Sequence, residues 1–143
     1  MKLPQTPSFR LDKKRALITG SSSGIGLGCA VAIAEAGASV VLAARRKNLL
    51  EDLKYALLKE GYKAEAIELD ITNTKAVKNF IKSQSTFDIL VNSAGLAKHT
   101  PAVETNEDDF NSVLNVNVKG SYFITKEIAK RLIEEKKPGS LIN

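Results

Sequence analysis

The chain has few of the residues that mark a secreted, metal-binding or membrane-spanning protein. Of its 143 residues, one is Cys, one is His and none is Trp. The single Cys29 cannot form an internal disulfide, so nothing requires an oxidising compartment. The longest apolar run, residues 29–34, is far too short to cross a bilayer. Residues 1–12 form a polar lead-in without the apolar centre of an export signal. We therefore expect no membrane span, no metal site and a cytoplasmic location.

A long basic stripe with interleaved aromatic residues, which is typical of nucleic-acid modules, is also missing. The net charge is +5, but the aromatic content is 6% and the positive charges fall in short clusters. Nucleic-acid binding would rest on net charge alone, and we do not expect it. Solvated helix faces and a site for a phosphorylated small molecule explain the excess better.

Short apolar runs alternate with longer amphipathic segments along residues 13–143. Such runs predict buried strands, and apolar residues at a spacing of three or four predict helices. The expected strands are 15–19, 39–43, 64–69, 87–92 and 140–143, where the sequence ends within the fifth strand. The expected helices are 24–36, 47–59, 74–83 and most of 106–135, with Gly120 as a weak point.

This alternation predicts one α/β domain with a doubly wound parallel sheet of the Rossmann type, incomplete at its C-terminus. Strand 64–69 alternates more than the first two, so we expect it nearer an edge. We expect helix 24–36 to pack through Ile25, Cys29 or Ala30, and Ile33, which recur at helical spacing.

A glycine-rich turn follows the first expected strand. In an open parallel sheet a ligand lies outside the carboxyl ends of the strands, where the first strand turns into its helix. Gly20 permits the tight turn, Gly24 lets a pyrophosphate approach the backbone, and Gly26 removes a side chain where helix meets sheet. Three serines, Ser21 to Ser23, add hydroxyl groups. The turn therefore predicts a phosphate cradle for a dinucleotide.

The Gly-x-x-x-Gly-x-Gly spacing of this turn resembles that of the short-chain dehydrogenase/reductase family, and further motifs agree in order. Residues 92–95, Asn-Ser-Ala-Gly, resemble the family's Asn-Asn-Ala-Gly after the fourth strand, with Ser93 replacing the second Asn. Asp70-Ile71 resembles the acidic residue that faces the adenine, and residues 115–120 resemble the helix that carries a catalytic Asn.

The resemblance implies a nicotinamide cofactor, a small alcohol or carbonyl substrate, and a homo-oligomer with its contact at the helix around Asn117. It implies a catalytic role for Asn117. The cofactor-binding residues that it implies are Gly20, Ser22, Ser23, Gly24, Ile25, Gly26, Asp70, Ile71, Asn92, Ala94 and Gly95.

Two arginines follow the second expected strand, where an acidic residue would hold the ribose 2′-hydroxyl of NAD. Arg45 stands close to the expected spacing, and no Asp or Glu occurs before Glu51. A guanidinium binds phosphate in bidentate fashion, so Arg45, with Arg46 adding field strength, favours NADP over NAD. Alternatively, both arginines are solvated residues that open a helix. Ser23 also stands where NADP-preferring relatives often carry a basic residue.

The Ser, Tyr and Lys of the family's active site have no counterpart here. Tyr55 with Lys59 and Tyr122 with Lys126 have the Tyr-x-x-x-Lys spacing, but the family's pair comes after the fifth strand. We expect neither pair to be catalytic. Two hypotheses follow: part of an NADP-dependent oxidoreductase that transfers a hydride between nicotinamide and an alcohol or carbonyl substrate, or a non-catalytic nucleotide-binding fragment. In both, the 143 residues alone are expected to be inactive.

Overall fold

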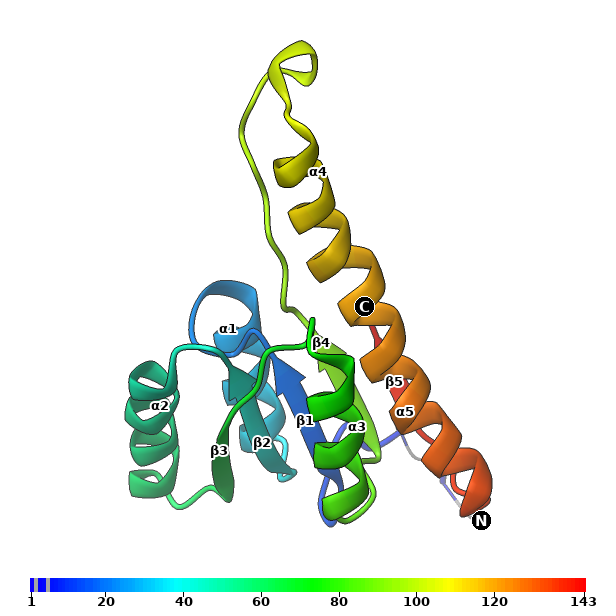
Figure 1. Ribbon diagram of the computed structural model, residues 1–143. Helices are drawn as coiled ribbons and strands as arrows, with labels where there is room; N and C mark the ends of the chain where they lie inside the picture. Colours follow the sequence, from blue (N-terminus) through cyan, green and yellow to red (C-terminus); the bar gives the residue numbers. More distant parts are fainter. Residues whose placement is uncertain (2, 5) are drawn as a thin grey trace.

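Five strands form one parallel sheet at the centre of the molecule (Figure 1). The computed structural model describes residues 1, 3–4 and 6–143. The strand order is β3-β2-β1-β4-β5, and every neighbouring pair is parallel. The strands are β1 (Arg15–Thr19), β2 (Ser39–Ala44), β3 (Ala64–Glu68), β4 (Ile89–Asn92) and β5 (Ser140–Ile142). The predicted doubly wound α/β sheet is confirmed, with β3 at one edge as expected.

Helices cover both faces of this sheet. One face packs against α1 and α2, and the other packs against α3 and α5. The helical segments are α1 (Gly24–Glu35), α2 (Lys47–Lys59), α3 (Thr74–Ser83), the 3-10 turn η1 (Ala102–Glu104), α4 (Glu107–Leu114), the π-helical turn η2 (Asn115–Gly120) and α5 (Ser121–Glu134). Among the described residues, none of these helices is long and apolar enough to span a membrane.

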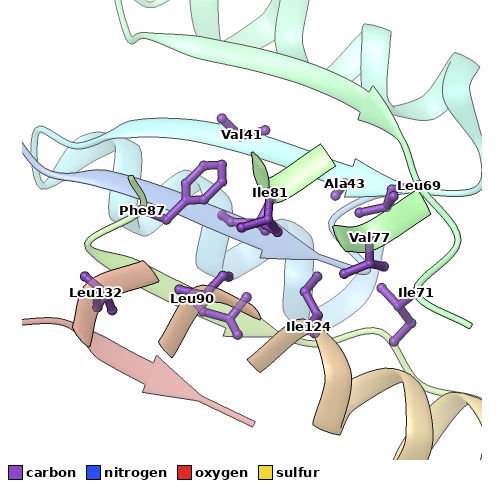
Figure 2. Close-up of a cluster of buried hydrophobic side chains, with 12 residues drawn as sticks. Val41, Ala43, Leu69, Ile71, Val77, Ile81, Phe87, Leu90, Ile124 and Leu132 are labelled. Atoms are coloured by element: carbon purple, nitrogen blue, oxygen red, sulfur yellow. The ribbon is translucent and has the colours of Figure 1, made fainter. Parts of the chain in front are cut away.

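Side chains of β1 alternate between two separate cores. Ala16 and Ile18 pack with α1 and α2, whereas Leu17 packs with α3 and α5. Figure 2 shows the core on the α3 and α5 side of the sheet. There, Val77 of α3 and Ile124 of α5 belong to the same cluster as residues of the strands. Because both faces are covered, β1 and β2 are apolar almost throughout, which is why their runs predicted strands.

The first helix meets the sheet through small residues, which differs from the predicted face. Its buried positions are Gly26, Ala30 and Ala34. The predicted Ile25 is wrong as a core residue, since it is 80% exposed, while Ile33 is partly buried against the cluster. Apolar residues surround this helix, so the spacing of the large ones did not identify the face that lies on the sheet.

Most predicted boundaries agree with the structure to within one residue, with two exceptions. The fourth strand begins at Ile89 and not at residue 87. The expected helix 106–135 is divided into α4, η2 and α5, and Gly120 is the last residue of the π-helical turn. A Cβ at Gly120 would lie 2.9 Å from Ile71 Cγ1, so a glycine allows the helix to approach this side chain. The weak point predicted at Gly120 thus coincides with a change of helix type.

Residues 96–119, here called the arm, project beyond the carboxyl edge of the sheet (yellow and light orange in Figure 1). The arm contains an extended segment, η1, α4 and most of η2. None of residues 96–119, all of which the structure describes, is buried. Burial resumes at Gly120 and continues along one side of α5.

Candidate functional site: a cleft at the carboxyl edge of the sheet

A cleft of about 350 Å³ lies at the carboxyl ends of the strands. Five segments contribute to its wall: the end of β1 with the glycine turn, the end of β2 and the residues after it, the residues that follow β3, the residues that follow β4, and one residue of η2. The lining residues are Thr19, Gly20, Ser22, Ser23, Ile25, Ala43, Ala44, Arg45, Arg46, Leu69, Asp70, Ile71, Ser93, Ala94, Gly95 and Val116.

The glycine turn is packed too closely to accept side chains at two positions. Gly20 has a φ of +65°, and a Cβ there would lie 2.5 Å from the carbonyl oxygen of Ser93. A Cβ at Gly26 would lie 2.4 Å from the carbonyl oxygen of Gly20. These contacts draw the start of α1 against the turn and the turn against the end of β4. The N-terminus of α1 is thereby fixed beside the cleft.

This helix terminus can receive an anion. The first N–H groups of a helix have no partner within it, and they carry the positive end of its dipole. The N-cap residue Ser23 makes no side-chain capping hydrogen bond, and the first turn of α1 contains no acidic residue. Together with the glycine contacts, this donor set fits the pyrophosphate of a dinucleotide.

Two serine hydroxyls of the turn accept hydrogen bonds from an arginine across the cleft. Arg46 Nη2 donates to Ser22 Oγ (2.9 Å) and to Ser23 Oγ (2.8 Å). Arg46 is the N-cap residue of α2 and its side chain is exposed. Arg45 also lines the cleft. The cleft therefore has two guanidinium groups at the end of β2, and the hydroxyls of the glycine turn hold one of them.

A buried polar pair forms the floor of the site between β1 and β4. Thr19 is 1% exposed and Asn92 is 9% exposed. Thr19 Oγ1 donates to Asn92 Oδ1 (2.6 Å) and accepts from Ala94 N (3.2 Å). Asn92 Nδ2 donates to Asn143 Oδ1 (3.2 Å), which also accepts from Thr125 Oγ1 (2.9 Å). The chain of hydrogen bonds links the carboxyl ends of β1 and β4 to α5.

The predicted acidic residue after β3 is held by its own turn. Asp70 Oδ1 accepts from Thr72 N (2.9 Å) and from Thr72 Oγ1 (2.8 Å). Ile71 is 4% exposed and belongs to the core on the α3 and α5 side. Asp70 therefore presents a fixed carboxylate at the cleft, while Ile71 connects the cleft wall to the core.

Asn117 binds the backbone of the arm's first residue. Its Oδ1 accepts from Leu96 N (2.8 Å), and its Nδ2 donates to Leu96 O (2.8 Å). The side chain thus fixes the chain just after Gly95 and lies in the π-helical turn η2, a helix type found often at functional sites. Asn117, Asn92 and Gly95 line a hollow next to the cleft.

The structure brings most of the predicted site residues to one cleft. Those that line it are Gly20, Ser22, Ser23, Ile25, Arg45, Arg46, Asp70, Ile71, Ala94 and Gly95. Gly24 and Gly26 shape the turn without lining the cleft, while Asn92 and Asn117 line the adjoining hollow.

Sequence reasoning missed six of the lining residues: Thr19, Ala43, Ala44, Leu69, Ser93 and Val116. A signal was available for Thr19, because a polar residue at the end of an otherwise apolar strand needs a buried partner. Nothing in the spacing indicated Val116, which reaches the cleft only through the packing of η2.

The two Tyr-x-x-x-Lys sequences lie outside the cleft. Tyr55 on α2 is 71% exposed, and Tyr122 on α5 is 65% exposed. Tyr122 packs edge-on against Phe123, and Lys126 lies over the same ring. Within the part of the chain that the structure describes, no group of three or more His, Cys, Asp or Glu residues could hold a metal ion.

Comparison with known proteins defines the class of this domain. The profile of the short chain dehydrogenase family matches residues 14–143, so the chain belongs to this family. Gluconate 5-dehydrogenase of Gluconobacter oxydans is 32% identical over 139 residues, which are 94% of this chain and 54% of the relative. The 3-oxoacyl-[acyl-carrier-protein] reductase FabG of Rickettsia prowazekii is 35% identical over 133 residues, 93% of this chain and 54% of the relative.

Solved structures agree with these sequence relatives. A gluconate 5-dehydrogenase from Burkholderia cenocepacia, solved with NADP and tartrate, superposes with a TM-score of 0.85 at 34% identity, over 95% of this chain and 55% of that one. A short-chain type dehydrogenase/reductase from Mycobacterium marinum gives 0.89 at 31% identity, over 94% and 56%. The chain spans about half the length of the relatives it matches.

Proposed function

We propose that residues 13–143 form the NADP-binding domain of an oxidoreductase that transfers a hydride between nicotinamide and an alcohol or carbonyl substrate. The observation that carries this proposal is the single cleft in which the glycine turn, both arginines and the residues after β4 meet. The family membership supports the reaction class. The NADP in the Burkholderia cenocepacia structure supports the cofactor.

Different residues of the cleft would bind different parts of the cofactor. The N–H groups at the start of α1 receive the pyrophosphate. Asp70 lies at the wall that would face the adenine, and the guanidinium groups of Arg45 and Arg46 stand where a 2′-phosphate needs positive charge. Ala94 and Gly95 continue the wall toward the hollow that contains Asn117. When bound, the cofactor supplies or accepts the hydride.

Asn117 is the residue of this chain that we assign to the reacting end of the cofactor. It lines the hollow that begins where the cleft ends, at Gly95. Its side-chain amide accepts a hydrogen bond from the backbone N–H of Leu96 and donates one to the backbone carbonyl of Leu96, so the side chain is held in one orientation. We infer that Asn117 fixes the chain beside the substrate and orders the site.

We also propose that the 143 residues alone bind the cofactor without turning it over. Neither the cleft nor the adjoining hollow is lined by a Tyr or Lys side chain among the described residues. The hollow at the proposed reacting end is also lined by no His, Asp, Glu or Cys among the described residues, so these residues supply no general acid there. This fits the second hypothesis, a nucleotide-binding fragment, for the isolated chain.

The exposed apolar side chains of the arm and α5 support association with a second copy. Phe110, Leu114, Val118 and Tyr122 follow one another at a spacing of four residues, and each is at least 41% exposed. Such a stripe along a helix is typical of a protein contact. We propose a homo-oligomer that buries it.

Titration with reduced nicotinamide dinucleotides tests the cofactor assignment. We expect NADPH to bind saturably, with its fluorescence as the readout, and NADH to bind at least about tenfold more weakly, because only NADPH uses the guanidinium groups through its 2′-phosphate. Binding of neither dinucleotide would overturn the proposed function. Equal affinities would overturn the NADP assignment alone. Consumption of NADPH by the 143 residues with a panel of carbonyl compounds would contradict their proposed inactivity.

A further inference from the structure

The end of the lead-in is folded against the C-terminus of α1. Arg10 Nη1 donates to the carbonyl oxygen of Glu35 (3.0 Å), the last residue of this helix. The next residue, Leu11, donates its backbone N–H to the carbonyl oxygen of the C-cap residue Ala36 (2.8 Å). Leu11 is also partly buried against the core on the α1 and α2 side. Two residues from outside the predicted domain thus bind the end of the helix.

These contacts complete the hydrogen bonds of the helix end. The last carbonyl groups of an α-helix have no partner within it. A Schellman motif around Gly37, whose φ is +106°, satisfies those of Ile33 and Ala34. The carbonyl groups of Glu35 and Ala36 remain, and these are the two that the lead-in binds. The turn after α1 alone would therefore leave the helix end incomplete.

Arg10 also supplies a charge that α1 does not have. The C-terminus of a helix carries the negative end of its dipole, where a cation is stabilising. The last turn of α1 contains no basic residue, and it contains the acidic Glu35. Asp12 holds the guanidinium in a bidentate pair, since it accepts from Arg10 Nε (3.2 Å) and from Nη2 (2.7 Å). The third nitrogen, Nη1, is thereby directed at the helix end.

We propose that Arg10 is a positioning residue for the phosphate cradle, because it fixes the far end of the helix whose first N–H groups receive the pyrophosphate. The inference rests on the proposed function, since it concerns the helix of the same site. It also extends the working part of the chain beyond residues 13–143, to include residues 10–12.

The way in which α1 lies on the sheet explains why its far end matters. Its buried positions are Gly26, Ala30 and Ala34, so no long side chain interlocks it with the strands. The close approach of Gly26 to Gly20 fixes the N-terminal end. The C-terminal end lies about 18 Å away, at 1.5 Å per residue, and Arg10 is a second fixed point there. Without it the helix can tilt about the first point and turn its N–H groups away from the pyrophosphate.

The test measures the dissociation constants of NADPH and NADH for variants of the full chain at a temperature where all of them are folded. Arg10→Ala removes both the bond to Glu35 and the charge at the helix end. We expect both dinucleotides to bind about two- to fivefold more weakly and in equal proportion, because they share the pyrophosphate. The effect is small because Arg10 is exposed to solvent.

Lys14→Ala is the matched control. It removes an equal charge from the same segment, but Lys14 pairs with Asp88 (3.6 Å) and not with α1. We expect it to change neither dissociation constant. A role of Arg10 in stability alone would lower the free energy of unfolding and leave both constants of the folded chain unchanged, as in this control.

Two milder variants test the geometry of the pair. Asp12→Ala keeps the cation but removes the carboxylate that holds it, so the loss of affinity should be smaller than in Arg10→Ala. Adding Asp12→Ala to Arg10→Ala should cost nothing further, because Asp12 acts through Arg10. Arg10→Lys should recover only part of the affinity, since an ammonium lacks the planar fork. These variants carry the same test if Arg10→Ala does not fold.

The outcomes separate this inference from the proposed function. Unchanged dissociation constants in folded Arg10→Ala would overturn the inference, and so would an equal loss in Lys14→Ala. A loss confined to NADPH would also overturn it, because a tilt of α1 affects both dinucleotides. In each of these cases the unmodified chain still binds NADPH, and the proposed function stands. Absence of binding by the unmodified chain would overturn the function itself, and the inference with it.

Discussion

The sheet with its covering helices and the arm differ in what keeps each in place. In β1 four of five residues are buried, and both faces of the strand are covered. In the arm, residues 96–119, all described, none is buried. The sheet is stabilised by apolar burial from within, whereas the arm is fixed at a few points. Polar contacts, such as Lys98 with Asp109 and Asn117 with Leu96, supply these points.

This difference divides the candidate site. The cleft that we propose for the cofactor is lined mostly by residues at and after the carboxyl ends of β1, β2, β3 and β4, so its geometry follows from the sheet. The hollow around Asn117 has one wall on the arm, through Leu96 and Ala97. We infer that the cofactor half is built into the fold of these residues, while the substrate half depends on further contacts that hold the arm. The following changes are ordered from the largest expected effect to the smallest.

Truncation of an apolar side chain should separate the two regions most strongly. Leu17→Ala leaves a cavity in the core beneath α3 and α5, and we expect a loss of about 2–5 kcal/mol in the free energy of unfolding. Val103→Ala removes part of a side chain that is 94% exposed on the arm, and we expect a change within about 0.5 kcal/mol. Urea unfolding measures both. Equal losses of stability in the two variants would contradict the difference between the sheet and the arm.

Removal of a threonine hydroxyl should show the same contrast for polar groups. Thr19→Val leaves Asn92 Oδ1 and Ala94 N without their buried partner, and we expect a loss of about 1–3 kcal/mol. Thr105→Val removes an exposed hydroxyl that bonds Pro101 O on the arm, and we expect less than about 0.5 kcal/mol. Thermal unfolding of the two variants measures the difference. A Thr19→Val variant as stable as the parent would show that the floor of the site does not depend on this bond.

Loss of the Asn117 amide should loosen the arm while sparing the sheet. We expect Asn117→Ala to cost about 0.5–1.5 kcal/mol, since two hydrogen bonds to Leu96 are lost at an exposed position. Hydrogen exchange at the Leu96 amide should accelerate, while exchange at the amides of β1 should change far less. Asn111→Ala, on α4 and without a side-chain hydrogen bond among the described residues, is the matched control. Unchanged exchange at Leu96 would contradict the fixing role.

Acid should weaken the interactions of Glu135 at the C-terminus of α5. Hydrogen bonds from Lys137, Thr86 and Arg131 lower the pKa of Glu135 from 4.5 to about 2. Because its folded pKa is depressed, its contribution is complete above about pH 4.5 and is lost as the pH falls toward about 2.

A charge-removing variant tests this acid dependence. Glu135→Gln should lower stability at neutral pH slightly and should reduce the acid dependence of urea unfolding between pH 4.5 and 2. Glu134→Gln is the control, since Glu134 pairs only with the exposed Lys130 among the described residues. A pH dependence in Glu135→Gln identical to that of the parent would contradict the assignment.

The sheet could be predicted from the sequence because its signals are local. Residues 15–19 and 39–44 are apolar runs next to glycine turns, and both are strands. The face of α1 could not be predicted, because its contact residues are small and lie among larger apolar residues on every side. Phe87 is a similar case: its side chain is buried, but the strand begins two residues later. Burial of a side chain and pairing of its backbone are separate properties.

The site was predicted as far as it depends on position in the fold. The ends of parallel strands meet at one edge, so Gly20, Arg45, Asp70 and Gly95 were expected to lie together, and all line the cleft. The bonds of Arg46 to the serines and of Asn117 to Leu96 depend on side-chain geometry between distant segments. No periodicity or spacing carries that information.

The π-helical turn η2 makes the length of this segment as important as its residues. An α-helix turns about 100° per residue, and a π turn accommodates one residue more than the α-helix around it. Deleting one residue from η2 would allow α4, η2 and α5 to form a continuous α-helix, in which α4 keeps nearly the same rotation about the axis because the π turn already accommodates the extra residue. The residues within η2, Asn117 among them, would change their positions around the axis, and the contact with Leu96 would be lost. The segment between Leu114 and Ser121 should therefore be as sensitive to insertions and deletions as it is to substitution of Asn117 or Gly120.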